Sequence, residues 1–251
     1  MLTTHRKQQI LELLKRQGQV IAKEVSHSMG VSEDTIRRDL RELAQEGLLQ
    51  RVHGGALPAS PAMADFAGRE SITPEGKVAI GRAAAEMIRP GQVVILDGGT
   101  TARQVARHIR LDLKATIVTH SPTIALELVP HPDIEVILIG GRMFKHSVVA
   151  VGAAAMEAIS HIHADIYFMG VTGVHPKTGL TTGDFEEAAV KRALSNAAAD
   201  TIVLASSEKL NTASPYAVVP LDEISGIITE RTADAALTEP YEKLKIPVTR
   251  A

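Results

Sequence analysis

Residues 32–40 read Ser-Glu-Asp-Thr-Ile-Arg-Arg-Asp-Leu and predict a short helix whose faces differ in chemistry. Ser32 stands at the N-cap position, and the two acidic residues after it fall in the first turn, where the helix dipole favours negative charge. Ile36, Leu40 and Leu43 recur at helical spacing, which predicts a face that packs inward. Another face carries four charged residues: Asp34, Arg37, Arg38 and Arg41. Such a helix suits the major groove of DNA, where arginine bonds guanine edges or phosphate.

Two helical segments precede this helix. Apolar residues recur at helical spacing over residues 5–17 and again over residues 21–29. Gly30-Val31 then predicts a tight turn before Ser32. The resulting order of helix, helix, turn and helix is that of a helix-turn-helix unit, in which the last helix is the recognition helix.

A small hairpin is expected after the recognition helix. Gly47 is placed to end that helix, and residues 48–57 predict two short strands around a Gly-Gly turn. A hairpin in this place is a wing, so residues 1–57 are expected to form a winged helix-turn-helix domain. An arginine stripe alone is more typical of a solvated helix face, but caps, turn and wing all agree with DNA binding. The candidate DNA-contacting residues are Ser32, Thr35, Arg37, Arg38, Arg41, Arg51 and His53.

The same part of the chain resembles a known family signature. Arg6, Ile10 and Leu14 are followed, after 17 intervening residues, by Ser32-x-x-Thr35-Ile36-Arg37-Arg38-Asp39-Leu40. In residue type and in spacing this pattern resembles the signature of the DeoR family of bacterial transcriptional regulators. The resemblance implies double-stranded operator DNA as the partner of the N-terminal domain and a sugar-phosphate-sensing domain behind it.

Composition and charge bound the class of protein. The chain has 251 residues, of which 45% are hydrophobic, enough to bury the cores of a small and a medium domain. It has no cysteine, which excludes disulfides and thiolate metal sites. We expect no signal peptide and no membrane span, and therefore a cytoplasmic protein. Residues 1–57 carry 9 basic and 7 acidic residues, whereas the rest carries 18 basic and 22 acidic, which fits one DNA-facing end.

The rest of the chain predicts a linker and an α/β domain. Residues 58–73 mix Pro, Ala, Ser and Gly without periodicity and are expected to form a linker. In residues 74–251 short apolar strands alternate with helices, which predicts a mostly parallel, doubly wound sheet. Strands are expected at residues 93–96, 115–118, 134–139, 165–170, 201–205, 226–229 and near 246–248. Helices are expected at residues 75–89, 101–109, 122–128, 153–159, 185–199 and 233–244.

Polar residues follow most of the predicted strands, and in sheets of this class ligands bind at the carboxyl ends of the strands. The stretch Asp97-Gly98-Gly99-Thr100-Thr101 opens a helix, whose free N–H groups favour a phosphate, and Asp97 is placed to accept bonds from sugar hydroxyls. Together these strand ends predict a pocket for a phosphorylated sugar. The candidate effector-binding residues are Asp97, Gly98, Gly99, Thr100, Thr101, Thr119, His120, Ser121, Gly141, Arg142, Asp184, Glu187, Lys191 and Lys209.

Each of these features also has a plainer structural explanation. A Gly-Gly-Thr-Thr turn is more often a strand-to-helix connection, Asp184 fits a helix cap, and Glu187 with Lys191 fits a surface ion pair. A competing hypothesis is a sugar-phosphate isomerase with an appended helix-turn-helix, because the same carboxylates and lysine offer acid–base chemistry. His161 and His163 lack a third ligand, and we expect neither a metal nor another cofactor.

The C-terminal part of the chain resembles the DeoR family as well, so that the two resemblances together cover nearly the whole sequence. Its landmarks are Asp97-x-Gly99-Thr100-Thr101, Gly140-Gly141, Asp184-x-x-Glu187-Ala188 with Lys191, and Ser207-x-Lys209. The resemblance implies a domain related in fold to ribose-5-phosphate isomerase and a repressor of carbohydrate genes with a phosphorylated sugar as effector. We expect it to bind DNA as a homodimer or homotetramer. His120 departs from the family, in which many members carry Asn after the threonine, so the choice of effector stays open, as does activation in place of repression.

Overall fold

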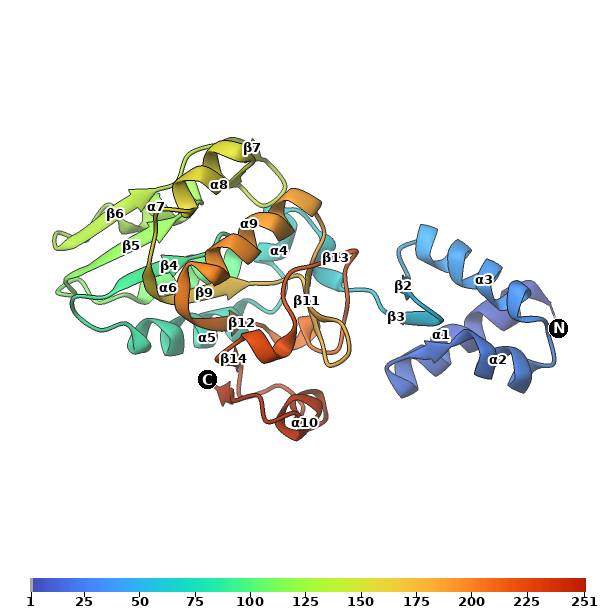
Figure 1. Cartoon of the computed structure of the whole chain (residues 1–251). Helices are drawn as coiled ribbons and strands as arrows, with labels where there is room; N and C mark the ends of the chain where they lie inside the picture. The colour runs from blue at the N-terminus through green and yellow to red at the C-terminus, as the bar shows by residue number, and fades with distance from the viewer. Residues whose placement is uncertain (1) are drawn as a thin grey trace.

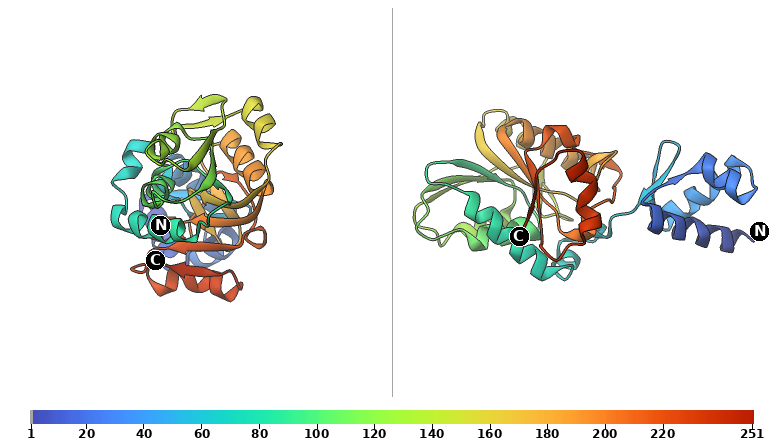
Figure 2. Two further views of the ribbon diagram at one scale, coloured as in Figure 1. Left: turned by 90° about the vertical axis from the view of Figure 1, so that its left-hand side faces the viewer. Right: turned by 90° about the horizontal axis from the view of Figure 1, so that it is seen from below.

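The computed structural model describes residues 2–251, which form a smaller head and a larger body joined by a short segment (Figure 1). The head is residues 2–58, the connecting segment is residues 59–73, and the body is residues 74–251. Figure 2 shows from below that head and body lie side by side, with the connecting segment between them. Polar contacts join the two directly: Lys177 Nζ in the body donates to Gln19 Oε1 in the head at 2.5 Å, and the Ala213 amide in the body donates to the Pro58 carbonyl oxygen at 3.1 Å.

The head is the winged helix-turn-helix that its sequence predicts. Its strands form a sheet in the order β1-β3-β2, in which β2 and β3 are the wing. Its elements are α1 (Thr3–Gln17), β1 (Val20–Ile21), α2 (Ala22–Met29), α3 (Glu33–Gln45), β2 (Leu49–Val52) and β3 (Gly55–Pro58).

The recognition helix α3 begins and packs as predicted. The Thr35 amide donates to Ser32 Oγ at 3.2 Å, which is the expected N-cap bond. Ile36, Leu40 and Leu43 are buried in the head core, as their spacing predicts.

The two-residue strand β1, by contrast, has no signal in the sequence. It pairs with β3 so closely that a Cβ on Gly55 would lie 1.8 Å from the Val20 carbonyl oxygen, and only glycine can occupy that place. The turn of the wing is therefore His53-Gly54, while the second glycine of the pair starts β3.

A buried ion pair fastens α1 to α3. Arg6 Nε lies 2.5 Å from Asp39 Oδ2, and Arg6 Nη2 donates to Asp39 Oδ1 at 3.0 Å. Asp39 is fully buried and Arg6 is 5% exposed, so neither charge has water as an alternative partner. The hydrogen bond to Asp39 raises the pKa of Arg6 against the opposing effect of burial, and the guanidinium stays charged.

The body contains the predicted parallel sheet, and all seven predicted strands are present. The strand order is β15-β14-β12-β9-β4-β5-β6, and every pairing in this sheet is parallel. The strands are β4 (Val93–Leu96), β5 (Ala115–Thr119), β6 (Ile134–Leu138), β9 (Ala164–Gly170), β12 (Ala198–Leu204), β14 (Gly226–Thr229) and β15 (Val248–Arg250). The chain runs outward from β4 through β6 in one direction and from β9 through β15 in the other, so the order reverses between β4 and β9.

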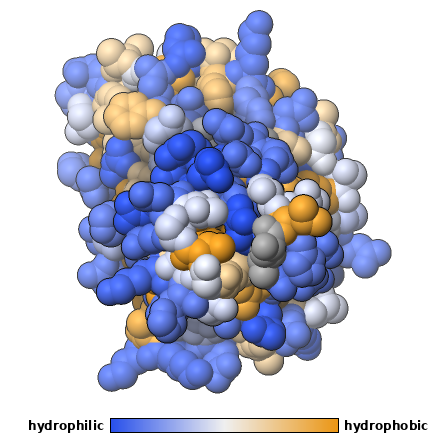
Figure 3. Space-filling view, turned by 90° about the vertical axis from the view of Figure 1, so that its right-hand side faces the viewer, coloured by the Kyte–Doolittle hydropathy of each residue, from blue (hydrophilic) through white to orange (hydrophobic). Residues whose placement is uncertain are grey.

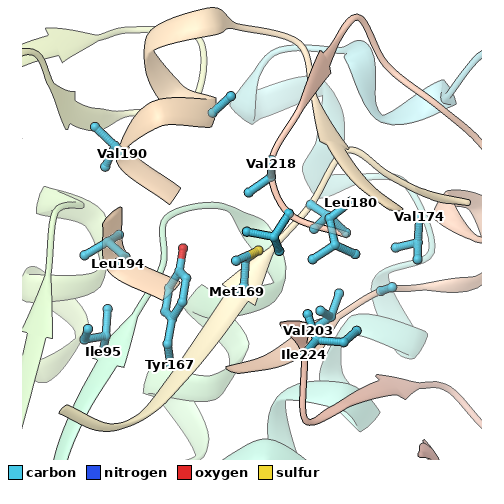
Figure 4. Packing of buried hydrophobic residues seen from close by; sticks show 14 of the residues in the cluster. Ile95, Tyr167, Met169, Val174, Leu180, Val190, Leu194, Val203, Val218 and Ile224 are labelled. Carbon is cyan, nitrogen blue, oxygen red and sulfur yellow. The ribbon is translucent and has the colours of Figure 1, made fainter. Parts of the chain in front are cut away.

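Helices cover both faces of the sheet, which makes the body doubly wound (Figure 1). Buried residues of α5, α6 and α7 form one hydrophobic cluster with the sheet, and those of α8, α9 and α10 form another. Figure 4 shows the second cluster, where Tyr167 of β9 lies among Ile95, Met169 and Leu194. The helices are α5 (Pro74–Met87), α6 (Thr100–His108), α7 (Pro122–Leu128), α8 (Ala153–Ile159), α9 (Phe185–Asn196) and α10 (Ala235–Lys243).

Two small antiparallel sheets and short 3-10 turns complete the body. The strands β7 (Arg142–Phe144) and β8 (Val149–Val151) form a hairpin, and β10 (Gly173–His175), β11 (Gly179–Thr182) and β13 (Tyr216–Ala217) form a sheet of three. None of these was predicted, because strands of two to four residues show no periodicity. The 3-10 turns of the body are η2 (Ser207–Lys209) and η3 (Leu221–Glu223).

The connecting segment is ordered against the body. It contains the 3-10 turn η1 (Pro61–Met63) and the short helix α4 (Phe66–Glu70). Ser60 Oγ donates to the Thr172 carbonyl oxygen at 2.5 Å, and the Phe66 amide donates to the His146 carbonyl oxygen at 2.9 Å. These bonds tie the segment to the body near its start and at its middle. Among residues 2–251, no helix combines the length and apolar character that crossing a membrane requires.

Candidate functional site

A cavity lies at the carboxyl ends of the central strands of the body, at the point between β4 and β9 where the strand order reverses. Ligands bind at this switch point in doubly wound sheets. The space free of protein atoms is about 490 Å³, a figure that includes open solvent at the mouth. The lining residues are Ala62, Arg69, Ile72, Lys77, Gly98, Gly99, Thr100, Thr101, Ala102, Ser147, Gly170, Val171, Thr172, Thr182, Glu187, Lys191, Glu208 and Lys209.

The loop between β4 and α6 forms one wall of the cavity through its backbone. Gly99 has φ +107°, a conformation that L side chains rarely adopt, and it stands at the N-cap of α6. A Cβ on Gly98 would lie 2.1 Å from Val149 Cγ1, so this position also requires glycine. No side chain caps α6, and the buried Thr101 hydroxyl has no hydrogen-bond partner among the described residues. The first turn of α6 therefore offers free donors to an anion.

Asp97 lies beneath this wall and holds several elements together. Its Oδ1 accepts from His120 Nε2 and the Gly98 amide, each at 2.8 Å. Its Oδ2 accepts from Lys191 Nζ at 2.5 Å and the Gly170 amide at 2.8 Å. Burial opposes the charge, but Lys191 and His120 outweigh it, and the pKa of Asp97 falls well below its usual range. All four acceptor positions of the carboxylate are used by the protein.

His120 is a structural partner of Asp97. Its Nδ1 faces the Ala150 carbonyl oxygen at 3.0 Å and its Nε2 faces the Asp97 carboxylate. Both ring nitrogens are therefore held by polar groups of the protein itself. The ring is fully buried and is absent from the cavity lining.

Positive charge dominates the lining, with four cationic side chains against the carboxylates of Glu187 and Glu208. Lys209 is 6% exposed, and its ammonium group has no hydrogen-bond or carboxylate partner within residues 2–251. Burial lowers the pKa of Lys209 to about 8, partly offset by Glu208. Burial also lowers the pKa of Lys77 and that of Arg69. Charged groups this deeply buried are ordinarily paired, so the lining has the character of an anion site.

The carboxylates of the lining have partial partners. Thr182 Oγ1 donates to Glu187 Oε2 at 2.6 Å, and Lys191 Nζ lies 3.9 Å from Glu187 Oε1. Glu208 accepts from Ser206 Oγ at 2.6 Å and from Thr73 Oγ1 at 3.1 Å. Glu187 therefore keeps one oxygen without a hydrogen bond from the described residues, which suits a ligand hydroxyl.

The structure brings many of the predicted effector residues together and sets others apart. Seven line the cavity: Gly98, Gly99, Thr100, Thr101, Glu187, Lys191 and Lys209. Four lie buried outside the lining: Asp97, Thr119, His120 and Ser121. The remaining three lie elsewhere. Gly141 and Arg142 stand at the start of β7, where Arg142 pairs with Glu186. Asp184 caps α9 by accepting a hydrogen bond from the Glu187 amide at 2.8 Å.

Arg69, Lys77 and Glu208 line the cavity but were not among the predicted residues. Lys77 had a detectable signal, since it stands on the same face of α5 as the buried Ile80 and Ala84, where a lysine is out of place. Arg69 had none, because its segment shows no periodicity.

The predicted DNA-facing residues lie on α3 and the wing. Arg38 and Arg41 are exposed, and Arg37 Nη2 donates to Glu33 Oε1 at 2.8 Å along the helix. A shallow groove between α3 and the wing is lined in part by Arg37, Arg51 and His53, which brings candidates from both elements together. Ser32 and Thr35 meet at the start of α3, with their hydroxyl oxygens 2.8 Å apart. Figure 3 views the molecule from the side of the head and shows mainly hydrophilic side chains there.

No metal site accompanies these features in the described part of the chain, residues 2–251. It holds no group of three or more histidine or carboxylate side chains placed to bind a metal ion. His161 lies beside Glu157 at 3.3 Å on the surface.

Comparison with known families and proteins gives matches along most of the chain. The DeoR-like helix-turn-helix domain matches residues 6–61, and the DeoR C terminal sensor domain matches residues 72–231. The HTH-type transcriptional regulator GlpR of Haloferax volcanii is 36% identical over 99% of this chain and 98% of its own length. The HTH-type transcriptional repressor GlcR of Bacillus subtilis is 32% identical over 93% and 91%. The glycerol-3-phosphate regulon repressor of Escherichia coli is 35% identical over 77% of each chain.

Two solved structures share a low level of similarity with this chain. Ribose 5-phosphate isomerase A of Methanocaldococcus jannaschii is 18% identical with a TM-score of 0.40, over 53% of this chain and 52% of that chain. The sorbitol operon regulator SorC of Klebsiella pneumoniae is 12% identical with a TM-score of 0.36, over 82% and 90%. Likenesses of this size carry no argument about activity.

Proposed function

Because the chain belongs to the DeoR family of transcriptional regulators, we propose that it represses a carbohydrate catabolic operon under the control of a phosphorylated sugar. In this proposal residues 1–57 bind operator DNA, residues 58–73 are the linker and residues 74–251 bind the effector. A symmetric homodimer or homotetramer presents its heads to repeated half-sites. The relatives from Bacillus subtilis and Escherichia coli are named as repressors, the latter of the glycerol-3-phosphate regulon, which supports repression.

The observation that carries the proposal is the buried, unpaired ammonium group of Lys209, which shares the cavity with the first turn of α6. A phosphate there would accept hydrogen bonds from Lys209 and from the free amides of α6 and so offset the cost of burying the charge. The hydroxyl groups of Ser147 and Thr182 and the carboxylate of Glu187 also line the cavity and suit sugar hydroxyls. The ammonium of Lys209 and the amides of α6 thus suit a phosphate, whereas the hydroxyl and carboxylate groups suit a polyol.

The proposal is tested with full-length protein and an operator selected from a random duplex library. One phosphosugar should change the DNA affinity by about 5- to 150-fold, the usual range of allosteric coupling. Its unphosphorylated form should leave the affinity unchanged. An operator affinity that no phosphosugar alters would contradict effector control by this class of compound.

Arg37→Ala should weaken operator binding by about 1–3 kcal/mol and relax sequence preference at one base position, because arginine bonds guanine bidentately. Binding to random and operator duplexes, measured by fluorescence anisotropy, checks this. Arg16→Ala removes another exposed arginine, from α1, and serves as the control. Equal weakening on every sequence would make Arg37 a phosphate contact instead.

Effector affinity should depend on pH through Lys209. A phosphate monoester loses its second proton near pH 6, whereas the pKa of Lys209 is about 8 in the unliganded protein. The dianion and the ammonium group therefore coexist between these values, and affinity should fall as the pH rises past 8 and Lys209 loses its proton. Calorimetric titrations from pH 6 to 9 measure this, and Lys209→Met should lose the alkaline decline along with most of the affinity. A wild-type affinity that stays constant to pH 9 would show that Lys209 does not bind the phosphate.

Isomerase activity in the same cavity is the alternative function, because Glu187 and Lys191 lie 3.9 Å apart in its lining. Asp97 has no acceptor position left for a substrate, which weighs against it as a base. Turnover of any pentose or hexose phosphate that Glu187→Gln abolishes would favour the enzyme over the sensor.

A further inference from the structure

We propose that the connecting segment is part of the phosphate site, with Arg69 of α4 binding the effector phosphate and so coupling effector binding to the segment that carries the head. This inference rests on the proposed function and deepens it, because it names the residue through which an occupied cavity acts on the head.

Arg69 is poised as an anion ligand. Its guanidinium lines the cavity and makes only long contacts, at 3.4 Å, from Nη2 to the His146 carbonyl oxygen and to Ser147 Oγ. Its Nε is buried and has no hydrogen-bond partner among residues 2–251. A guanidinium has five N–H donors in a planar fork that matches phosphate, and here most of them are unused.

A second observation points to an anion in the cavity that Arg69 lines. The unpaired ammonium of Lys209 and the unpaired hydroxyl of Thr101 face the cavity that Arg69 lines, and both residues are more than nine-tenths buried. Three unsatisfied donors from three separate elements, α4, α6 and η2, thus surround one space. A single phosphate offers enough acceptor oxygens to satisfy all three at once.

Two further contacts near the C-terminal end of α4 come from residues of the cavity lining. Lys77 Nζ donates to the Arg69 carbonyl oxygen. Thr73, which follows α4 and has φ +46°, donates through Oγ1 to Glu208. Because Lys77 and Glu208 both line the cavity, a ligand that attracts the ammonium of Lys77 or repels the carboxylate of Glu208 acts on the C-terminal end of α4 and on the residues that follow it.

Only a short stretch of chain separates Arg69 from the wing of the head. Upstream of α4, Ala62 also lines the cavity and Ser60 bonds the Thr172 carbonyl oxygen. The second strand of the wing, β3, ends at Pro58, two residues before Ser60. A phosphate that tightens α4 against the body therefore restricts the segment from which the wing extends, and the head loses freedom of placement relative to the body.

Amide hydrogen exchange in full-length protein tests this inference, with inorganic phosphate as the probe and chloride at equal ionic strength as the reference. Phosphate should slow the exchange of amides in residues 64–73 by roughly tenfold. In Arg69→Gln the phosphate affinity should fall by about tenfold or more. At phosphate concentrations that saturate this variant, phosphate should still stabilise the body against unfolding. The amides of residues 64–73, however, should exchange at the rate that they have in chloride.

Arg103→Gln is the matched control. Arg103 also holds α4, through Glu70 at 2.7 Å, but it does not line the cavity. The phosphate-induced protection of residues 64–73 should persist in this variant, whatever the basal exchange rate.

Two results would overturn the inference while leaving the phosphate site in place. One is a body that phosphate stabilises without any change in the exchange of residues 64–73, and the other is equal protection in Arg69→Gln and wild type. If phosphate neither stabilises the wild-type body nor slows exchange anywhere in it, the phosphate site fails, and the inference fails with it.

Discussion

Asp39→Ala is expected to unfold the head, at a cost of about 3–5 kcal/mol, because it leaves the buried guanidinium of Arg6 without its partner. Arg6 is 5% exposed and its two bonds to Asp39 are its only side-chain hydrogen bonds within residues 2–251. A small domain of this size has little stability to spare, so operator binding should be lost with the fold. Circular dichroism melting and limited proteolysis of the full-length protein report the loss.

Two further variants test whether the loss of stability comes from breaking the buried ion pair. Asp34→Ala removes an exposed carboxylate from the same helix and should change stability by less than about 0.5 kcal/mol. Arg6→Met combined with Asp39→Leu removes both charges and should recover much of the stability lost in Asp39→Ala. A head that melts normally in Asp39→Ala would show that the pair does not hold α1 on α3.

Asp97→Ala is expected to have the other large effect, a loss of about 3–5 kcal/mol from the body together with loss of effector binding. It removes the shared acceptor of Lys191, His120 and two backbone amides from a fully buried place. At this size the melting temperature should fall by roughly 6–20 °C. The comparison is Asp184→Ala, which removes the N-cap of α9 and should cost only about 1 kcal/mol.

The same site predicts how stability depends on acid. The pKa of Asp97 is depressed in the folded protein, so its stabilising effect is fully present above the unfolded value near 3.8 and is lost as the pH falls toward the folded value. Asp97→Asn should flatten this part of the acid-stability curve, measured by urea unfolding between pH 5 and 2. A curve that keeps its wild-type slope would mean that other carboxylates govern acid unfolding.

The parallel sheet could be predicted because its strands are buried on both faces and are therefore continuously apolar. Val93–Leu96 is an example: the sequence Val-Val-Ile-Leu is followed at once by polar and glycine residues, so the strand and its end are both visible. The paired strands β10 and β11 are equally buried but last three and four residues, and their pairing depends on contacts that only the fold creates.

The cavity could be predicted only where its residues follow a central strand. The Gly98–Thr101 loop follows β4, beside the switch point, and lines the cavity. Arg142 also follows a strand, but β6 is at the edge of the sheet, and the chain there turns into a hairpin away from the centre. The rule that ligands bind at strand ends holds for strands that meet at the switch point and not for those at the edge.

The role of Asp97 could not be read from its position after a strand. The sequence suggested a contact with sugar hydroxyls, whereas the structure surrounds the carboxylate with donors from the chain itself. Those donors come from Gly98, His120, Gly170 and Lys191, which are up to 94 residues away. Arg69 and Lys77 were missed for the same reason, since only tertiary folding brings the connecting segment and α5 over the strand ends.

The most direct test of phosphosugar control is a thermal-shift measurement on the full-length protein, with each phosphosugar run beside its unphosphorylated form and with Lys209→Met run beside wild type. A ligand at 100 times its dissociation constant adds about 2.7 kcal/mol to the state it binds, which at this size raises the melting temperature by roughly 5–11 °C. We expect such a rise with one phosphosugar, none with the unphosphorylated sugar, and none in Lys209→Met. An equal rise with the unphosphorylated sugar, or no rise with any phosphosugar, would contradict phosphosugar control.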